Sequence, residues 1–246
     1  MTLPAAEGVR EPLPTVILCG GLGTRIRSVA GDLPKSMLPV AGRPFIAHQL
    51  ELLRGAGVRE VILCVGYGAS RIQSFVGDGA AFGLSVRYAR EDPDRLLGTG
   101  GALVHALPLL PDRFFVLYGD SWLPVDYGQI GAAFVSCSCP AMMTVLRNEG
   151  RWDASNARVR DGRVVFYSKR AGPGEADWID YGLNAFRREV IERYRPAAMP
   201  LDLAAILEDL VAAGELAAYE VTERFYEIGR PESYRELDEL LRARGA

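Results

Sequence analysis

The sequence has little of several residue types on which many enzymes depend, histidine above all. Two histidines occur among 246 residues, His48 and His105, which nearly excludes a metal site with several imidazole ligands or a histidine proton relay. We therefore expect any metal ion to be a hard cation held by carboxylates. Catalysis should depend on arginine, lysine and that metal ion instead of imidazole.

Cysteine is also scarce, and its four positions form no recognisable metal or redox motif. Cys19 and Cys64 each end an apolar run, so we expect both to be small buried side chains. Cys137 and Cys139 are separated by one residue, a spacing that neither a zinc site nor a redox pair uses. No charged and then apolar leader is visible at the start, so the expected compartment is the reducing cytoplasm.

The sequence also lacks an excess of positive charge and any long apolar run. The chain has 28 Lys+Arg against 31 Asp+Glu, a formal net charge of −3. This mild acidity argues against non-specific binding of nucleic acid, which needs a basic face. No apolar run approaches the roughly 18 residues that cross a membrane. We therefore expect a globular protein that binds neither nucleic acid nor membrane.

What the sequence does contain is an alternation of apolar strands and helices, which is typical of a doubly wound α/β sheet. In the first half we expect strands at residues 15–19, 58–65, 84–88 and 114–117, and helices at residues 46–53, 70–76 and 100–107. In the second half we expect strands at residues 141–146, 157–160, 163–167, 178–186, 219–221 and 225–228, and helices at residues 201–213 and 232–243. The prediction is a single Rossmann-like, mostly parallel, doubly wound sheet flanked by helices, with a small β-rich subregion in the second half.

These patterns divide the chain into a short arm and one domain. Residues 1–14 contain three prolines and little periodicity, so we expect an extended N-terminal arm. Residues 15–246 form the domain, in two halves that cover about residues 15–125 and about residues 126–246. A chain of this length can bury one large core, and α/β proteins of this size often form one domain.

A glycine-rich loop follows the first buried strand, at the strand end where open α/β sheets bind ligands. The loop reads Gly20-Gly21-Leu22-Gly23-Thr24-Arg25. Glycines let several peptide N–H groups approach one ligand and Arg25 adds positive charge, so the loop suits a phosphate group. It matches neither the dinucleotide pattern, because Ile26 replaces the third glycine, nor Walker A, because Pro34 precedes Lys35. A plain turn is the alternative, which Arg25 and Lys35 in one segment disfavour.

A second segment reads Pro34-Lys35-Ser36-Met37-Leu38-Pro39-Val40, and its prolines stiffen the backbone around Lys35. Taken alone, Lys35 could equally be a solvated surface residue. The two segments together resemble the signature of the sugar-1-phosphate nucleotidyltransferases, also called nucleotide-sugar pyrophosphorylases. The resemblance extends over nearly the whole chain. It implies that the first half binds the nucleotide and that the β-rich second half binds the sugar and the metal ion.

The resemblance also implies roles for individual residues. Arg25 and Lys35 would be catalytic, since Arg25 would stabilise the departing pyrophosphate and Lys35 would offset charge on the triphosphate. The implied nucleotide-binding residues are Leu18, Gly20, Gly21, Gly23, Thr24, Gly98 and Thr99. The implied sugar-phosphate-binding residues are Lys169, Tyr181 and Gly182, and the implied ligands of Mg²⁺ are Asp120 and Glu227.

Two positions depart from the family pattern. Glu227 stands where aspartate is usual, and Ser168 and Arg170 replace the glutamate and proline that usually flank the lysine at Lys169. A lysine at the edge of a hairpin is therefore the alternative interpretation of Lys169.

The implied reaction is nucleotidyl transfer, in which a sugar 1-phosphate oxygen attacks the α-phosphorus of a nucleoside triphosphate and pyrophosphate leaves. The attacking phosphate is already an anion, so no general base is required and two histidines suffice. Residues 25–29 and the segment Leu97–Ala102 resemble the D-glycero-α-D-manno-heptose 1-phosphate guanylyltransferases within the family. This favours GTP and that heptose phosphate as substrates, with GDP-heptose as product.

Several alternatives stay open. The enzyme could use UTP with a hexose or N-acetylmuramate 1-phosphate. A glycosyltransferase would also use a nucleotide-binding α/β sheet, although Asp120-Ser121-Trp122 lacks the second acid of its usual metal motif. A non-catalytic sensor of nucleotide sugars is the third reading, which the presence of Arg25, Lys35 and Asp120 disfavours. Members of the family often form oligomers, so a homodimer is among the states that the resemblance implies.

Overall fold

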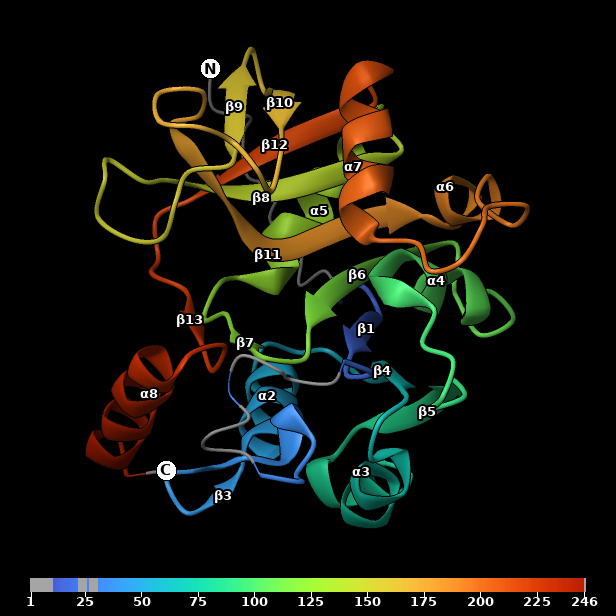
Figure 1. The fold of residues 1–246 in the computed structure, drawn as a ribbon, viewed down its shortest axis with the longest axis vertical. Helices are drawn as coiled ribbons and strands as arrows, with labels where there is room; N and C mark the ends of the chain where they lie inside the picture. The colour runs from blue at the N-terminus through green and yellow to red at the C-terminus, as the bar shows by residue number, and fades with distance from the viewer. Residues whose placement is uncertain (1–10, 22–25, 27–30, 246) are drawn as a thin grey trace.

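The computed structural model describes residues 11–21, 26 and 31–245, which build a nine-stranded mixed sheet between two layers of helices (Figure 1). In the first half the spatial order is β5 (Ser85–Arg90), β4 (Glu60–Val65), β1 (Thr15–Leu18) and β6 (Arg113–Tyr118). All three neighbouring pairs are parallel, and helices cover both faces, so these strands are nearly continuous apolar runs. Because β4 lies on one side of β1 and β6 on the other, a crevice is expected at the carboxyl ends of β1 and β6.

The second half of the sheet is mixed, which corrects the prediction of a mostly parallel sheet. From β6 onward the order is β11 (Trp178–Arg187), β8 (Ala141–Arg147), β12 (Leu216–Val221), β10 (Arg163–Tyr167) and β9 (Ala157–Arg160). β8 and β12 are parallel, whereas β11 runs antiparallel to β6 and β8, and β10 runs antiparallel to β12 and β9. The physical reason is that no helix separates β9, β10 and β11, and connections without a crossover favour antiparallel pairing.

Helices cover both faces of the sheet, as the prediction of a doubly wound fold requires. One face packs against α2 (Phe45–Gly55), α3 (Ala69–Val76) and α5 (Tyr127–Ser136), and the other against α4 (Gly98–His105), α6 (Arg188–Glu192) and α7 (Leu203–Ala212). Alternate residues of β1 serve the two layers, since Ile17 belongs to the first core and Val16 and Leu18 belong to the second.

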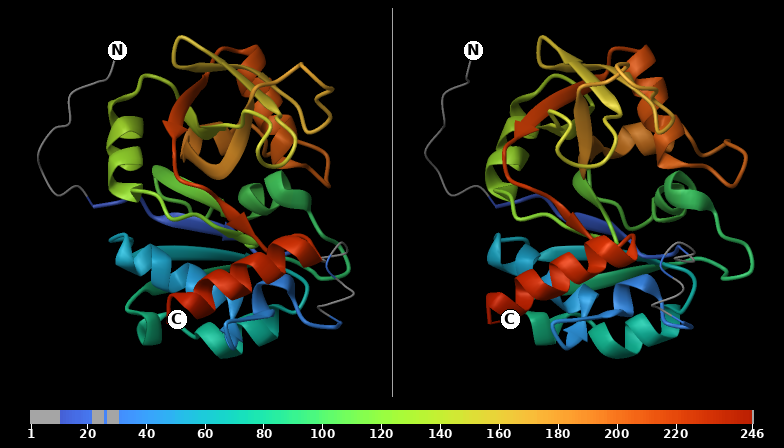
Figure 2. Two further views of the ribbon diagram at one scale, coloured as in Figure 1. Left: turned by 90° about the vertical axis from the view of Figure 1, so that its left-hand side faces the viewer. Right: turned by 60° about the vertical axis from the view of Figure 1, so that its left-hand side comes forward.

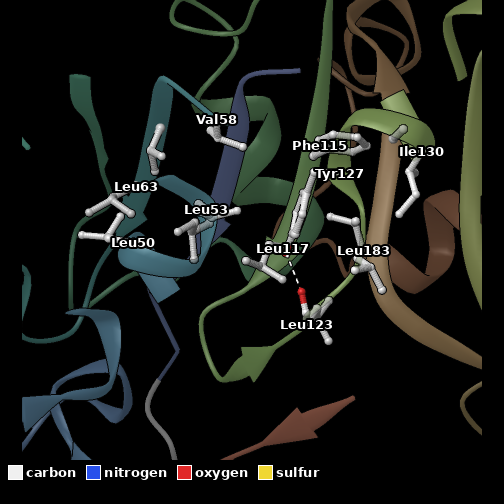
Figure 3. Close-up of a cluster of buried hydrophobic side chains, with 14 of the residues drawn as sticks. Leu50, Leu53, Val58, Leu63, Phe115, Leu117, Leu123, Tyr127, Ile130 and Leu183 are labelled. Atoms are coloured by element: carbon white, nitrogen blue, oxygen red, sulfur yellow. Dashed lines mark hydrogen bonds between the residues drawn. The ribbon is translucent and has the colours of Figure 1, made fainter. Parts of the chain in front are cut away.

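Figure 3 shows part of the first core, where residues of α2 and α5 lie against the sheet. Tyr127 is fully buried, and its ring meets the ring of Phe115 edge-on with the centroids 5.8 Å apart. The Tyr127 hydroxyl donates a hydrogen bond of 3.2 Å to the carbonyl oxygen of Leu123. The large aromatic ring is therefore buried without leaving its polar group unsatisfied.

The C-terminal helix α8 (Pro231–Ala243) returns to the first half of the chain and lies beside α2 (Figure 2). Its apolar side chains Leu237 and Leu241 are buried in a third core with Val40 and Phe45. The Tyr234 hydroxyl also donates a hydrogen bond of 2.6 Å to a backbone carbonyl in that half, at Pro39. The last helix of the second half therefore packs against the first half, across the boundary that the sequence places near residue 125.

Short elements complete the fold. They are the pair β2 (Pro39–Val40) and β3 (Arg43–Pro44), the pair β7 (Ser121–Trp122) and β13 (Tyr226–Glu227), and the 3₁₀ turns η2 (Lys35–Met37) and η3 (Ala80–Phe82). β13 lies antiparallel to β7, and Glu227 is the register partner of Ser121. This pair brings the chain after β12 back to the end of β6.

The predicted strands and long helices are confirmed to within a few residues, but α5 and α6 were not predicted. α5 contains two glycines, which weaken helical propensity, and its start is fixed by Asp126, whose carboxylate accepts the N–H of Gln129 at 2.9 Å. Cys19 and Cys64 are buried as expected. Residues 1–10 of the predicted arm lie outside the described residues. Within the described part of the chain, no helix has the length and apolarity needed to cross a membrane.

Replacing Leu237 with alanine tests whether α8 belongs to the cooperative unit. The side chain is fully buried, and removing such a leucine costs about 2–5 kcal/mol through lost burial and the cavity that remains. We expect chemical denaturation to show a loss of this size, whereas the exposed neighbour Glu239, changed to alanine, should lose less than about 0.5 kcal/mol. A single transition with equal stability in both variants would contradict this view of α8.

Candidate active site

A cavity of about 360 Å³ opens at the carboxyl ends of β1 and β6, where the order of the strands reverses. Its lining combines backbone of the glycine loop with a few polar side chains and an apolar floor. The lining residues are Leu18, Cys19, Gly20, Gly21, Lys35, Ser36, Glu91, Leu96, Gly98, Thr99, Ala102, Tyr118, Gly119, Asp120 and Lys169. Nucleotide-binding residues Leu18, Gly20, Gly21, Gly98 and Thr99, predicted from separate segments, therefore line one cavity together with Lys35, Asp120 and Lys169.

Three predicted residues, Gly23, Thr24 and Arg25, lie outside the described residues. Their roles in binding and catalysis stay predictions.

The ends of β1 and β6 approach each other closely, and glycine makes this possible. The N–H of Gly119 donates a 3.0 Å hydrogen bond to the carbonyl oxygen of Leu18. A Cβ at Gly119 would lie 2.6 Å from that same oxygen, closer than any side chain tolerates. Asp120 follows directly, so the strand end carries its carboxylate to the edge of the glycine loop.

Lys35 and Asp120 form an ion pair across the cavity wall between Lys35 Nζ and Asp120 Oδ2. Their side chains are 16% and 22% exposed, so the pair is shielded from most solvent but accessible from the cavity. Lys35 begins η2 between Pro34 and Leu38, and the chain is held there by the N–H of Met37, which donates to the Pro34 carbonyl at 2.8 Å. The segment therefore presents Lys35 as a fixed positive charge.

A second ion pair joins Lys169 to Asp202, a residue that we did not predict. Lys169 Nζ lies 2.8 Å from both carboxylate oxygens of Asp202. The same carboxylate caps α7, since Oδ1 accepts the N–H of Ala204 at 2.9 Å and the hydroxyl of Thr99 at 3.0 Å. Burial of Asp202 acts to raise the pKa of its carboxyl, but hydrogen bonds from Ala204 and Lys169 outweigh it and lower that pKa.

The glycines at the start of α4 are explained by close packing as well as by ligand access. The N–H groups of Gly100 and Gly101 donate hydrogen bonds of 2.9 and 3.1 Å to the carbonyl oxygen of Leu201. A Cβ at Gly98, whose φ is +79°, would lie 2.5 Å from that oxygen. The segment that leads into α7 is therefore locked onto the start of α4, which brings Asp202 to Thr99.

Glu91 is another cavity residue that we did not predict. It is 5% exposed, and Oε2 accepts the N–H of Leu97 at 2.8 Å. A Cβ at Gly20 would lie 3.1 Å from Oε1, so the carboxylate borders the glycine loop. Burial raises the pKa of the Glu91 carboxyl, and the Leu97 hydrogen bond opposes this effect in part.

Tyr181 and Gly182, the other two predicted sugar-binding residues, are neighbours in β11. Tyr181 is 2% exposed on the core side of β11 and meets Phe225 edge-on, with ring centroids 5.9 Å apart. The Tyr181 side chain therefore packs in the core, and the part of this segment in sugar binding stays a prediction. Gly182 has a φ of +98°, which favours glycine, and donates a 3.0 Å hydrogen bond to Asp180.

The backbone around Glu227 lies close to the backbone of Asp120. The N–H of Ile228 donates to the Asp120 carbonyl at 2.9 Å, whereas the Glu227 side chain lines a neighbouring cavity of about 550 Å³ with Trp152 and Arg224. Within the described ranges, no group of three or more His, Cys, Asp or Glu side chains is arranged to hold a metal ion. The role of Asp120 and Glu227 as ligands of Mg²⁺ stays a prediction.

Among the described residues, the cavity lining contains no histidine and one cysteine, Cys19. The His48 ring bonds the Val40 carbonyl at 2.8 Å, and the His105 ring bonds the Arg90 carbonyl at 2.9 Å, away from the cavity lining. Cys19 lines the cavity, but burial and the Asp120 charge raise the pKa of its thiol to about 12, so it is not a nucleophile near neutral pH.

One signal in the sequence could have directed attention to the two ion pairs. Among the 28 Lys+Arg residues of the chain, the two lysines are Lys35 and Lys169. Both line this cavity, and each is bonded to an aspartate. Arginine supplies every other basic side chain, and a lysine kept at these two positions indicates a need for a compact ammonium charge.

Comparisons with known proteins agree with this geometry. A family model described as "Nucleotidyl transferase" matches residues 14–244. The mannose-1-phosphate guanylyltransferase of Mycobacterium tuberculosis is 30% identical over 223 residues, which cover 89% of this chain and 62% of that protein. The D-glycero-alpha-D-manno-heptose 1-phosphate guanylyltransferase of Campylobacter jejuni is 36% identical over 118 residues, which cover 48% of this chain and 52% of that protein.

Among solved structures, HddC from Yersinia pseudotuberculosis complexed with GMP-PN superposes with a TM-score of 0.76 at 27% identity, covering 93% of this chain and 99% of that chain. Proteins named as uridylyltransferases and a thymidylyltransferase match as well. The chain spans less than two thirds of the length of the first curated relatives. Nearly the whole chain fits the family model and its fold, and it therefore belongs to the nucleotidyl transferase family.

Proposed function

We propose that this chain transfers a nucleotidyl group from a nucleoside triphosphate to a sugar 1-phosphate, with release of pyrophosphate and formation of a nucleotide sugar. The observation that carries the proposal is that both lysines of the chain and Asp120 line one cavity, at the end of a glycine loop. Such a set of fixed charges suits two phosphorylated substrates, and nucleotidyl transfer depends mainly on positioning and charge stabilisation.

The residues present fit Mg²⁺ bound together with substrate. Mg²⁺ commonly uses one or two carboxylates with substrate phosphates and water, and does not need a complete protein cage. Asp120 would supply the carboxylate, because it lies just after β6 in the cavity lining and is paired with the positive charge of Lys35. Glu227, the other predicted ligand, is the register partner of Ser121, the residue that follows Asp120. When bound, the metal ion would neutralise charge on the phosphate oxygens.

Three basic side chains of this chain would bind the phosphate groups. Lys35 would offset charge on the triphosphate, and Lys169 would hold the phosphate of the sugar. Arg25, in the glycine loop, would stabilise the departing pyrophosphate. The nucleophile arrives as an anion, so the chain needs to orient it and does not need to remove a proton.

GTP is the proposed nucleotide, and Glu91 supports this choice. Guanine offers two adjacent donors, N1–H and N2–H₂, on one edge, which a carboxylate can accept together. Uracil offers one N–H between two carbonyl oxygens, which a carboxylate would repel. Glu91 is buried beside Gly20, and a relative bound to GMP-PN shares the fold. We also propose a D-glycero-α-D-manno-heptose 1-phosphate as the sugar, supported by the match to the C. jejuni protein.

The alternative functions differ in what they would do with these substrates. UTP with a hexose or N-acetylmuramate 1-phosphate is the second candidate, supported by the uridylyltransferases among the matching proteins. A glycosyltransferase would hydrolyse or transfer from a nucleotide sugar without forming pyrophosphate, and a sensor would bind without turnover. A homodimer and a cytoplasmic location belong to the same proposal.

A screen of the four ribonucleoside triphosphates and dTTP against heptose, mannose, glucose and N-acetylmuramate 1-phosphates tests the proposal directly. We expect pyrophosphate release to be fastest with GTP and the heptose phosphate, and to stop when Mg²⁺ is chelated. Faster turnover with UTP would establish the second candidate instead. Binding without pyrophosphate release from any pair would overturn nucleotidyl transfer itself.

Changing Arg25 or Lys35 to alanine should lower kcat by about 10²–10³-fold each, the usual effect of removing one preorganised charge in an active site. The melting temperature should stay within a few degrees of the unmodified protein, because the proposed role of each side chain is to act on the bound phosphates. Arg59 is exposed, precedes the amino end of β4 and does not belong to the cavity lining, so Arg59→Ala is the matched control and should keep full activity. Unaltered turnover in the Arg25 or Lys35 variant would exclude that residue from catalysis.

Changing Glu91 to glutamine should lower the preference for GTP over UTP by about tenfold or more, since a bidentate base contact contributes about 1–3 kcal/mol of discrimination. The ratio of kcat/KM for the two nucleotides measures this preference, with the exposed Glu60→Gln as control.

Because burial raises the pKa of Glu91, this carboxyl takes up its proton at a higher pH than an exposed glutamate. The KM for GTP should therefore rise on acidification in the unmodified protein, and a Glu91→Gln variant with the same pH profile would refute the role.

A further inference from the structure

We propose that Asp202 is a positioning residue that holds Lys169 in place for the phosphate of the sugar substrate. The proposal rests on the proposed function, which gives Lys169 that ligand. It goes further by assigning a role to an acid on a different element, 33 residues away along the chain.

The contacts of Asp202 exceed what capping a helix requires. An N-cap aspartate needs one oxygen to accept a backbone N–H, and Oδ1 of Asp202 does this for Ala204. Oδ2 adds nothing to the cap, yet it lies 2.8 Å from Lys169 Nζ, as Oδ1 does. The second oxygen therefore serves the lysine.

The carboxylate itself is fixed from several directions, so it can act as an anchor. Thr99 donates its hydroxyl to Oδ1 at 3.0 Å and accepts the N–H of Leu203 at 2.8 Å. The carbonyl of Leu201, the residue before Asp202, is held by the start of α4. These bonds tie the acid to α4 and α7 at once, whereas the lysine follows β10 on an irregular segment.

Lys169 keeps a donor for a ligand while it is held. An ammonium group has three N–H donors, and the two carboxylate oxygens use at most two of them. Its side chain is 46% exposed and lines the cavity. A flexible four-carbon side chain that is already ordered loses less entropy when the phosphate binds, which tightens binding.

Asp180 also lies near enough to act on Lys169 through its charge, but its bonds point elsewhere. Its carboxylate accepts the N–H of Gly182 at 3.0 Å and the hydroxyl of Tyr167 at 3.4 Å. The charge of Lys169 is one of the weaker influences on the pKa of the Asp180 carboxyl. Asp202 is thus the acid that bonds the lysine directly.

Two variants separate positioning from capping. Asp202→Asn keeps an oxygen that can cap α7 and accept from Thr99, but loses the charge that holds Lys169. Asp202→Ser keeps a good cap with a side chain too short to grip the lysine. Asp126→Asn is the matched control, because Asp126 caps α5 in the same way and lies outside the cavity lining.

Both Asp202 variants should raise the KM for the sugar 1-phosphate about three- to tenfold, the effect of no longer ordering one long side chain. The KM for the nucleotide should change less than about twofold, and the melting temperatures should match that of Asp126→Asn. Native sugar KM in Asp202→Ser would show that the residue is a cap alone and would overturn the proposal.

A second readout does not depend on turnover. Lys35 and Lys169 are the two lysines of the chain, so an amine-acylating reagent followed by mass spectrometry reports on each separately. We expect Lys169 to be acylated several-fold faster in Asp202→Asn than in the unmodified protein, with Lys35 unchanged as internal reference. Equal rates at Lys169 would refute the proposal. If no substrate pair is turned over, the proposed function fails, and the acylation rates still decide the role of Asp202.

Discussion

The close approach of β1 and β6 at their carboxyl ends is the constraint on which the rest of the site depends. The hydrogen bond from Gly119 to Leu18 leaves no room for a side chain between the strands. It brings the glycine loop, which follows β1, beside Asp120, which lies two residues after the end of β6. A wider gap would separate the phosphate-binding backbone from the carboxylate that we propose as a metal ligand. The tight packing of this sheet region, with helices on both faces, keeps that distance short.

Charge in the cavity is arranged in two similar pairs. Lys35 faces Asp120, and Lys169 faces Asp202, so each lysine has an acid that fixes it before any ligand arrives. The first pair connects the segment after the glycine loop to β6. The second connects the β-rich half to α4 and α7. Fixed charges of this kind cost little reorganisation when phosphates bind, which is the main source of electrostatic catalysis.

Much of this was predictable from sequence because the relevant signals are local. Apolar runs and glycine positions located β1, β4 and the glycine loop, and the Gly-Asp pair after a buried strand located Asp120. The mixed second half of the sheet was missed, although the sequence contains a signal for it. The strands predicted at residues 157–160, 163–167 and 178–186 follow one another without a helix between them, which favours antiparallel pairing. A motif also gives the position of a residue in a strand, as it did for Tyr181, but the register of that strand decides which face the side chain occupies.

The sequence by itself determined the class of chemistry. Two histidines nearly excluded a metal site with several imidazole ligands or a histidine proton relay, and the motifs around Gly20 and Lys35 indicated binding of polyphosphate. The tertiary structure alone decided which acids accompany the lysines. Asp202 lies 33 residues from Lys169, and Glu91 is about 70 residues from the glycine loop that it borders. No spacing rule connects such positions, because their proximity arises from the packing of α4 against α7 and of parallel strands in one sheet.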